Sequence, residues 1–199
     1  MTVHKRIVLA SGNKGKVKEI QAILADRGIE VVPQSEFGVE EAEEIGLCFV
    51  ENAIIKARNA AKHTGLPAIA DDSGLSVDAL KGEPGVFSSR YAGPDCNDED
   101  NNEMLLKNLK GVLHEQRSAR FQCAIVYMQH EKDPMPLIAQ ASWEGFIVEE
   151  RAGKNGFGYD PLFYVPTHNC TSAELPAEIK NQISHRSQAL KKFIECFKG

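Results

Sequence analysis

The first third of the chain alternates between a strand pattern and a helix pattern of apolar positions. Residues 6–10 contain a short continuous apolar run, which predicts a buried strand. Helical spacing then predicts a helix over 16–27, which Gly28 can end. The apolar stripe of this helix consists of Val17, Ile20, Ile23 and Leu24. A second short strand over 30–33 gives the chain a βαβ-like opening.

The clearest helical pattern covers residues 49–62, where alanines recur on one side. A strand is predicted over 66–70, and it would deliver the polar run 71–74 at its carboxyl end. The segment 81–94 is rich in Gly, Pro and Ser, so it is predicted to be a loop. Acidic residues in a first turn then favour a helix over 98–109.

The second half of the chain begins with β-rich segments. Residues 119–128 and 137–148 are predicted to form a long antiparallel hairpin, and 162–165 a further short strand. A final helix is predicted over 184–197. Its inward-facing residues are Leu190, Phe193, Ile194 and Phe197.

Together these elements predict an α/β fold, with a mixed central sheet, flanking helices and a long β-hairpin lobe. Apolar residues make up 42% of the chain, enough to bury a core. No repeat, low-complexity tract or linker divides the 199 residues. A single domain over 1–199 is therefore expected.

Charge and composition narrow the classes of partner. The chain has 28 acidic and 23 basic residues, a formal net charge of −5. Because no global positive field attracts DNA or RNA, no nucleic-acid polymer is expected as a partner, although a local lysine cluster can bind a small polyanion. No apolar stretch approaches the roughly 20 residues that a membrane helix needs, so no membrane partner is expected.

The five cysteines indicate the compartment. They lie far apart and form no CxxC pair, so neither a zinc ribbon nor a disulfide framework is indicated. No secretory signal pattern is recognisable either. We therefore expect a cytoplasmic protein with reduced thiols.

The segment between the first strand and the first helix is a candidate phosphate-binding loop. It consists of Ser11, Gly12, Asn13, Lys14, Gly15 and Lys16. Glycines expose backbone N–H groups, and a helix N-terminus carries partial positive charge. Lys16 lies where the helix dipole disfavours a cation, unless an anion binds nearby. It is not a Walker A loop, because Val17 replaces the Ser or Thr that holds magnesium. The alternative is a solvated basic loop that caps the helix.

The adjacent carboxylates of Asp71 and Asp72 are a candidate metal site. They follow a predicted strand, where α/β proteins usually bind ligands. Two adjacent negative charges favour a cation beside them. Oxygen ligands indicate Mg²⁺, which also binds substrate phosphates, and Mn²⁺ could also serve. The alternative is that Asp72, Ser73 and Gly74 simply make a turn.

Two further segments have both a functional and a structural interpretation. Asn52 and Lys56 share one face of the helix over 49–62, which fits either a binding face or a solvated one. Glycines flank Phe157 in the segment 156–161, which suggests a planar ligand stacked on the ring. A tight loop with that ring in the core is the alternative.

Basic residues also gather before and at the start of the last predicted helix. Lys180 precedes it, Ser184 can cap it, and His185 and Arg186 fall in its first turn. Because cations there oppose the helix dipole, we expect His185 and Arg186 to be exposed donors for an acceptor-rich ligand.

Six motifs occur in an order and spacing that resemble one enzyme family over nearly the whole chain. They are SGNKGK at 11–16, FVENAIIKA at 49–57, ADDSGL at 70–75, PGVFSSRYAG at 84–93, NGFGYDPLF at 155–163 and SHRSQAL at 184–190. In these motifs the chain resembles the noncanonical purine nucleoside triphosphate pyrophosphatases, the inosine/xanthosine triphosphatase family. The resemblance implies that family's fold, a homodimer, and Mg²⁺-dependent hydrolysis of ITP, dITP and XTP to monophosphate and pyrophosphate.

The resemblance also implies roles around the phosphates. The loop 11–16 would grip the triphosphate, together with Lys56. Asp72 would be the general base and a metal ligand, with Asp71 beside it. Glu44 would be the other metal-binding carboxylate, a position that Glu43 could also fill.

For the rest of the substrate, the resemblance implies contacts from the second half of the chain and from Ser73. The residues that would cradle the base and sugar are Phe157, Gly158, Tyr159 and Asp160. Lys180, His185 and Arg186 would complete base recognition. Donors from His185, Arg186 or loop amides suit the 6-oxo group of hypoxanthine or xanthine, whereas adenine presents a 6-amino donor that such a site leaves unpaired.

Other functions are compatible with parts of the pattern. A Maf-like pyrophosphatase would act on modified pyrimidine or ordinary triphosphates, and a substrate panel separates the two enzymes. A nucleotide sensor would bind ITP with Mg²⁺ without hydrolysing it, although the complete carboxylate set argues against that. A purely structural protein would not need cations set against helix dipoles.

Overall fold

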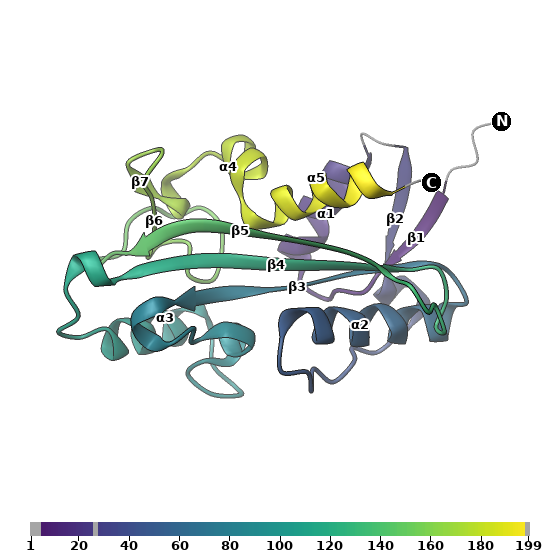
Figure 1. Cartoon of the computed structure of the whole chain (residues 1–199), viewed down its shortest axis with the longest axis horizontal. Coiled ribbons are helices and arrows are strands. Elements are labelled where there is room, and N and C mark those ends of the chain that lie inside the picture. Colours follow the sequence, from purple (N-terminus) through teal and green to yellow (C-terminus); the bar gives the residue numbers. More distant parts are fainter. Residues whose placement is uncertain (1–4, 26–27, 198–199) are drawn as a thin grey trace. The chain divides into compact units, whose positions relative to one another are not determined.

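Strands within residues 5–25 and 28–197, the part of the chain described by the computed structural model, form one seven-stranded sheet. They are β1 (Lys5–Leu9), β2 (Ile29–Pro33), β3 (Ala68–Val77), β4 (Ser118–Met128), β5 (Leu137–Ile147), β6 (Phe163–Val165) and β7 (Cys170–Thr171). Their order is β2-β1-β3-β4-β5-β6-β7 (Figure 1). Strand β1 pairs in parallel with β2 and β3, whereas β6 pairs antiparallel with β5 and β7. The predicted mixed sheet is confirmed.

The helices largely follow the predicted ranges. They are α1 (Lys14–Ala25), α2 (Phe49–Thr64), α3 (Asp98–Asn108), α4 (Ala177–Ile183) and α5 (His185–Cys196). Helix α1 begins two residues earlier than predicted, and its predicted end at Arg27 lies outside the described residues. Helix α4 and strand β7 were not predicted. No described helix is long and apolar enough to cross a membrane.

The chain divides into two compact units. The first contains residues 1–72, 123–141 and 186–199, and the second contains 73–122 and 142–185. Strands β3, β4 and β5 each contribute residues to both units.

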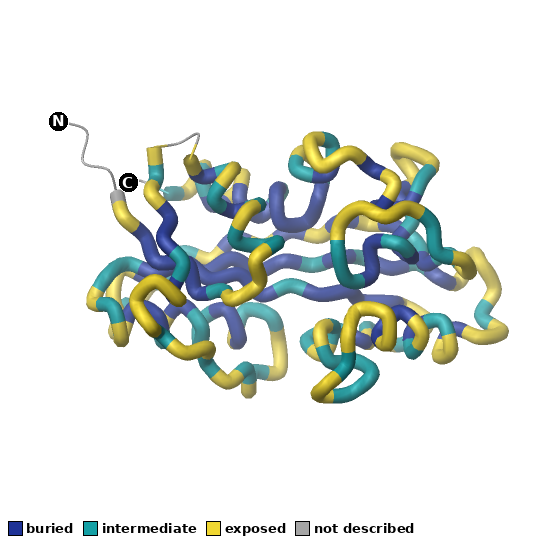
Figure 2. The backbone as a smooth tube through the Cα atoms, turned by 180° about the vertical axis from the view of Figure 1, so that it is seen from behind, coloured by how far each residue is buried: buried dark blue, intermediate teal, exposed yellow. Residues whose placement is uncertain are grey.

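Side chains of β1 alternate between two cores in the first unit. Ile7 and Leu9 pack with apolar residues of α1 and α5. Val8 and Ala10 pack with the alanines of α2. Figure 1 shows α1 and α5 on one face of β1 and β3, with α2 on the opposite face. Covering both faces explains the continuous apolar run over residues 7–10, which Figure 2 shows in the colour of buried residues.

The core of the second unit is aromatic. The ring centroid of Phe121 lies 4.6 Å from that of Phe163 and 6.4 Å from that of Trp143. Aliphatic residues of β3, α3 and α4 surround these rings. Aromatic pairs at these separations add to the free energy gained from apolar burial.

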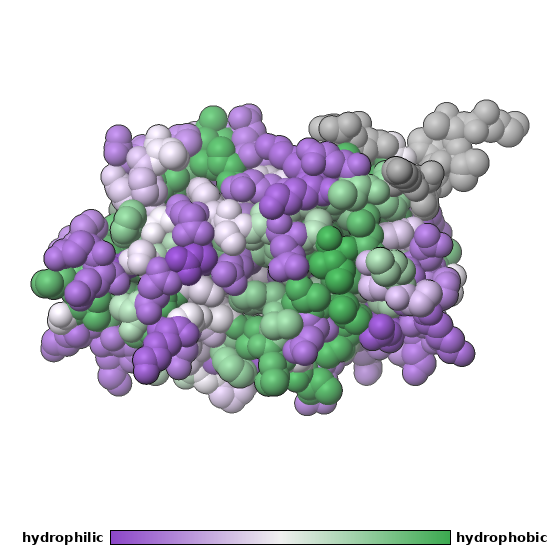
Figure 3. All heavy atoms as spheres, in the orientation of Figure 1, coloured by the Kyte–Doolittle hydropathy of each residue, from purple (hydrophilic) through white to green (hydrophobic). Residues whose placement is uncertain are grey.

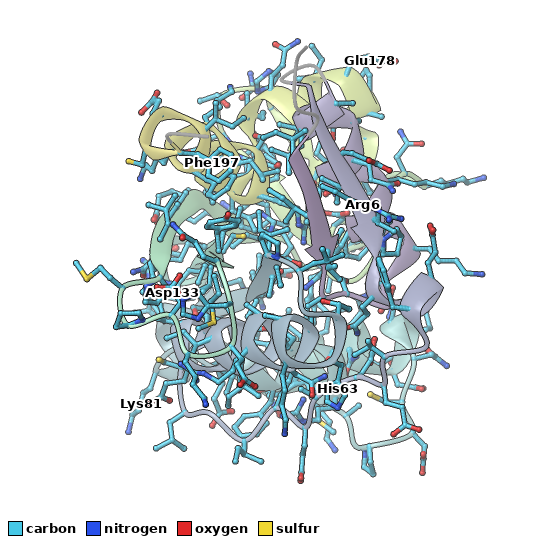
Figure 4. All side chains as sticks on the ribbon, turned by 90° about the vertical axis from the view of Figure 1, so that its right-hand side faces the viewer. Arg6, His63, Lys81, Asp133, Glu178 and Phe197 are labelled. Atoms are coloured by element: carbon cyan, nitrogen blue, oxygen red, sulfur yellow. The ribbon has the colours of Figure 1, made fainter. Side chains whose placement is uncertain are left out.

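Strands β4 and β5 are neighbours joined by the short segment 129–136, which confirms the predicted hairpin, because parallel neighbours need a much longer crossover. Asp133, labelled in Figure 4, closes this connection. Its carboxylate accepts hydrogen bonds from the amides of Gln129 at 2.8 Å and Met135 at 3.0 Å. Such side-chain bonds to nearby amides are typical of Asp in turns.

The prediction that the run 71–74 follows a strand was wrong. Strand β3 continues to Val77, so Asp71 and Asp72 lie inside it. Nine of its ten residues are buried. Burial on both faces outweighs the local turn preference of Asp, Ser and Gly, as tertiary context often does.

Candidate functional site

A lysine and two carboxylates meet within the first unit. The ammonium of Lys56 on α2 donates hydrogen bonds of 2.8 Å to Glu44 Oε1 and of 2.8 Å to Asp72 Oδ1. The Lys56 side chain is 14% exposed and that of Asp72 is 8% exposed. The structure thus brings together three predicted site residues from a loop, a helix and a strand.

Asn52, one turn before Lys56, fixes this arrangement. It is fully buried, and its amide donates to Asp72 Oδ2 at 3.3 Å and accepts from the Gly46 amide at 2.8 Å. A Cβ atom on Gly46 would lie 2.6 Å from Glu51 Cβ, so only glycine lets the chain approach α2 here. The predicted face of α2 is therefore a buried polar contact and not a solvated one.

Burial and the neighbouring charges shift the pKa values of Asp72 and Lys56. Burial raises the pKa of Asp72, and the opposing charge of Lys56 only partly offsets it. Burial would lower the pKa of Lys56, but Asp72, Asp71 and Glu44 together raise it well above its usual value. Lys56 is therefore a permanent cation, and Asp72 is the carboxylate in this cluster that takes up a proton more readily than usual.

The preceding loop carries four glutamates with different surroundings. Glu44 contacts Lys56, whereas Glu43 is exposed and bonds through its carbonyl to the Ile45 amide. A Cβ atom on Gly12 would lie 2.0 Å from Glu41 Oε1, so Glu41 lies against the loop 11–16. Figure 3 shows apolar residues gathered in the region of α2. Leu47, in the segment just before α2, is 89% exposed.

Asp71 has different partners from Asp72. Its Oδ2 lies 3.2 Å from Lys16 Nζ and 3.3 Å from Arg186 Nε. Arg186 also pairs through Nη1 with Glu19 of α1. Burial would raise the pKa of Asp71, but Lys16 and Arg186 together hold it far below its ordinary value. Asp71 is therefore a buried carboxylate whose charge two cations already balance.

The expectation that His185 and Arg186 are exposed was wrong. His185 is 6% exposed and Arg186 is 2% exposed. His185 belongs to the second unit, where its ring stacks on Phe121 at 4.9 Å between centroids. Sequence spacing could not reveal the two carboxylate partners of Arg186, because Asp71 is 115 residues away in the sequence and Glu19 is 167 residues away.

The loop 11–16 is ordered by its own side chains. Asn13 Oδ1 accepts hydrogen bonds from the amides of Gly15 at 2.9 Å and Lys16 at 3.1 Å, so it caps α1. Ser11 Oγ accepts from the Asn13 amide at 3.3 Å. Gly12, Asn13 and Lys14 are exposed. An anion here would meet the exposed part of the loop and the ammonium groups, while Asn13 occupies the two helix amides.

In the second unit, a buried ion pair supports Phe157. Lys180 Nζ donates to Asp160 Oδ2 at 2.5 Å and lies 5.1 Å from the centroid of the Phe157 ring. Asp160 Oδ2 also accepts from the Phe157 amide at 2.9 Å, and its Oδ1 accepts from Ser172 Oγ at 2.8 Å. Phe157 is half-buried. Ser172 was not predicted, and nothing in its local sequence indicates this role.

The other predicted residues of the second unit differ in exposure. Tyr159 is buried, and its hydroxyl donates to the Ser88 carbonyl at 2.8 Å, so it supports the loop from within. Gly158 and Ser73 are half-buried. Within the unit, the structure therefore brings Phe157, Gly158 and Lys180 together around Asp160.

Similarity to known proteins extends over almost the whole chain. Residues 7–196 match the Ham1 family. A dITP/XTP pyrophosphatase of Thioalkalivibrio sulfidiphilus is 58% identical over 194 residues, which cover 98% of this chain and 99% of that protein. A dITP/XTP pyrophosphatase of Photorhabdus laumondii is 54% identical over 195 residues, with 98% and 99% coverage.

Solved structures agree with this similarity. A HAM1 protein from Coxiella burnetii superposes with a TM-score of 0.89 at 55% identity, covering 94% of this chain and 95% of that one. The Staphylococcus aureus Ham1 protein has a TM-score of 0.84 at 44% identity, with 96% and 98% coverage. Fold, family match and sequence identity all lead to one assignment, and the chain belongs to the Ham1 family.

Proposed function

We propose that the chain hydrolyses noncanonical purine nucleoside triphosphates, dITP, ITP and XTP, to the monophosphate and pyrophosphate. The observation that carries the proposal is the cluster of Glu44, Lys56 and Asp72, where a cation and a proton-accepting carboxylate lie side by side. The relatives named dITP/XTP pyrophosphatase support the substrate class.

We propose Mg²⁺ as the cofactor, held by Glu44 and Asp72. Their carboxylates converge on one ammonium, which places two candidate oxygen ligands close together. Among the described residues no group of three His, Cys, Asp or Glu side chains could hold a metal. Two carboxylates still suit Mg²⁺, which completes its shell with water and substrate phosphates. Bound there, Mg²⁺ would supply positive charge to the phosphate oxygens.

We propose that Asp71 pairs with Lys16 and does not bind the metal. Its carboxylate is buried between Lys16 and Arg186, whose charges already balance it. Displacing either cation would break an ion pair of a fully buried carboxylate, which is costly. Asp71 would therefore hold Lys16 beside the loop 11–16, where its ammonium can meet a phosphate.

The residues of the cluster divide the reaction among them. Asp72 accepts a proton from the water that attacks the α-phosphorus. A new oxygen–phosphorus bond forms, the bond to the bridging oxygen breaks, and pyrophosphate leaves. The ammonium groups of Lys56 and Lys16 stabilise the charge that gathers on that leaving group.

We assign base recognition to the loop of the second unit. The half-buried ring of Phe157 offers a stacking surface, and Lys180 behind it is fixed by Asp160. Donors that face a 6-oxo group would favour hypoxanthine and xanthine, because adenine presents a donor there and leaves buried groups unpaired.

Product analysis tests the proposal. The purified protein is incubated with Mg²⁺ and, separately, ITP, XTP, GTP, ATP and a modified pyrimidine triphosphate. Release of pyrophosphate and monophosphate from ITP and XTP is the expected result. Orthophosphate as the product, or preference for the pyrimidine or ATP, would refute the proposal. Binding of ITP without turnover would instead identify a sensor.

We also propose a cytoplasmic homodimer. The family resemblance supports the dimer, and the five cysteines, all free thiols in the structure, support a reducing compartment. Light scattering coupled to size-exclusion chromatography tests the dimer, for which twice the chain mass of 21.9 kDa is expected.

A further inference from the structure

Two side chains in the N-terminal part of α3 bind the backbone amide and the backbone carbonyl of Gly158. Asp98 Oδ2 accepts a hydrogen bond of 2.7 Å from the Gly158 amide. Asn102 Nδ2 donates one of 2.9 Å to the Gly158 carbonyl. Gly158 has a positive φ of 61°, a conformation that such paired contacts can keep in place. The residue directly after Phe157 is therefore fixed at both its polar backbone groups.

The two side chains that hold Gly158 are themselves fixed. Asn102 is 3% exposed, and its Nδ2 also donates to the Asp98 carbonyl at 2.8 Å. Asn97 caps the start of α3 by accepting from the Glu99 amide at 2.8 Å and the Asp100 amide at 3.1 Å. Capping immobilises the first turn, which carries Asp98. Helix α3 is thus a rigid support, and Asn102 links it to the loop.

The neighbours of Gly158 are anchored elsewhere in the second unit. The Phe157 amide donates to Asp160, and the Tyr159 hydroxyl donates to Ser88. The Phe157 carbonyl also accepts from the Asp160 amide at 3.3 Å, which closes a turn around Gly158. The contacts to α3 add a second restraint, since they act on the amide and the carbonyl of Gly158 itself.

We propose that Asn102 and Asp98 are positioning residues for nucleobase binding, acting through Gly158 on the orientation of the Phe157 ring. The inference rests on the proposed function, in which Phe157 stacks on the base. A ring held in its binding orientation needs no ordering when the substrate arrives, and preorganisation of this kind increases affinity. Loss of the support would weaken substrate binding without touching the reacting groups.

The chain offers a matched control in the neighbouring residue. Asn101 is 2% exposed and belongs to the same helix, but its amide accepts from the Ala92 amide at 2.9 Å and donates to the Ser89 carbonyl at 3.2 Å. Asn101→Leu and Asn102→Leu therefore each replace a buried amide by an apolar side chain of similar volume. Only Asn102→Leu removes a contact to Gly158.

The experiment measures kcat and KM for ITP and for ATP, together with Tm, in both variants. Similar decreases in Tm are expected. Asn102→Leu should raise KM for ITP about tenfold, the equivalent of one lost buried hydrogen bond, with kcat within about twofold of the original. Asn101→Leu should leave KM within about twofold. Equal changes in KM in the two variants, or a loss of kcat alone in Asn102→Leu, would overturn the inference.

Amide hydrogen exchange gives a readout that is independent of catalysis. Exchange over 156–160 should be faster in Asn102→Leu and unchanged in Asn101→Leu. If the leucine variants do not fold, Asp98 provides the same test, because Asp98→Asn keeps an oxygen for the Gly158 amide and should rescue the KM that Asp98→Ala raises. Equal KM values for the two Asp98 variants would overturn the inference. Failure of the unmodified protein to act on ITP would instead refute the proposed function.

Discussion

The ammonium of Lys56 donates a hydrogen bond of 2.8 Å to the carboxylate of Asp72, the residue expected to accept a proton during turnover. This contact favours the ionised form of Asp72, while burial and the neighbouring Glu44 favour the protonated form. Opposed influences of this kind set the pH at which a buried carboxylate acts as a base.

Asp72→Asn should lower kcat for ITP at least about 100-fold, because the amide cannot accept the proton of the attacking water. The fold should persist, since asparagine retains the shape of the side chain. Steady-state kinetics and circular dichroism measure both effects. Asp78→Asn, an exposed substitution at the Arg120 ion pair, is the control and should retain normal turnover. Near-normal kcat in Asp72→Asn would remove Asp72 from the role of base.

Lys56→Met should move the acidic limb of the kcat/KM profile to higher pH. The substitution removes the charge that lowers the pKa of Asp72 and leaves burial and Glu44, which both raise it. More alkaline conditions are then needed to deprotonate Asp72. The profile is measured with ITP at saturating Mg²⁺. An unchanged limb, with only a uniform loss of rate, would show that Lys56 does not control Asp72.

Glu44→Gln should increase the Mg²⁺ concentration needed for half-maximal activity about tenfold or more, because it removes one of two proposed carboxylate ligands. Glu43→Gln is the matched control, since that side chain is exposed on the same loop and should leave the requirement unchanged. Mg²⁺ titrations of initial rate distinguish the two variants. A larger effect from Glu43→Gln would exchange the two assignments.

Much of the fold could be predicted because long elements have a clear period. Burial of Ile7 and Val8 follows from the continuous apolar run, and the buried alanine side of α2 follows from helical spacing. The continuation of β3 through Asp71 could not be predicted, because local preference there favours a turn. The partners of Arg186 escaped prediction as well, since long-range ion pairs leave no local pattern.

Asp71→Asn should lower the free energy of unfolding by about 3 kcal/mol at pH 7, because it removes the carboxylate that Lys16 shares with the buried Arg186, although Glu19 still pairs with Arg186. The pKa of Asp71 lies below its unfolded value of about 4, so the ionised form stabilises the fold above that pH. This stabilisation is lost as the pH falls toward the folded pKa.

Urea unfolding at pH 7 and pH 3 measures this dependence. The difference in stability between the original chain and Asp71→Asn should be smaller at pH 3. Asp78→Asn, which breaks an exposed ion pair, should cost less than about 1 kcal/mol at pH 7. A difference for Asp71→Asn that grows on acidification would contradict the predicted sign.

The close approach of Gly46 to α2 has a consequence for redesign of this enzyme. Its amide is bonded to Asn52, only two residues after Glu44 in the chain, and no larger side chain fits there. Engineers who wish to diversify the loop should therefore introduce insertions upstream of Glu40. Even a one-residue change in length between Glu44 and Gly46 would carry the Glu44 carboxylate out of reach of Lys56.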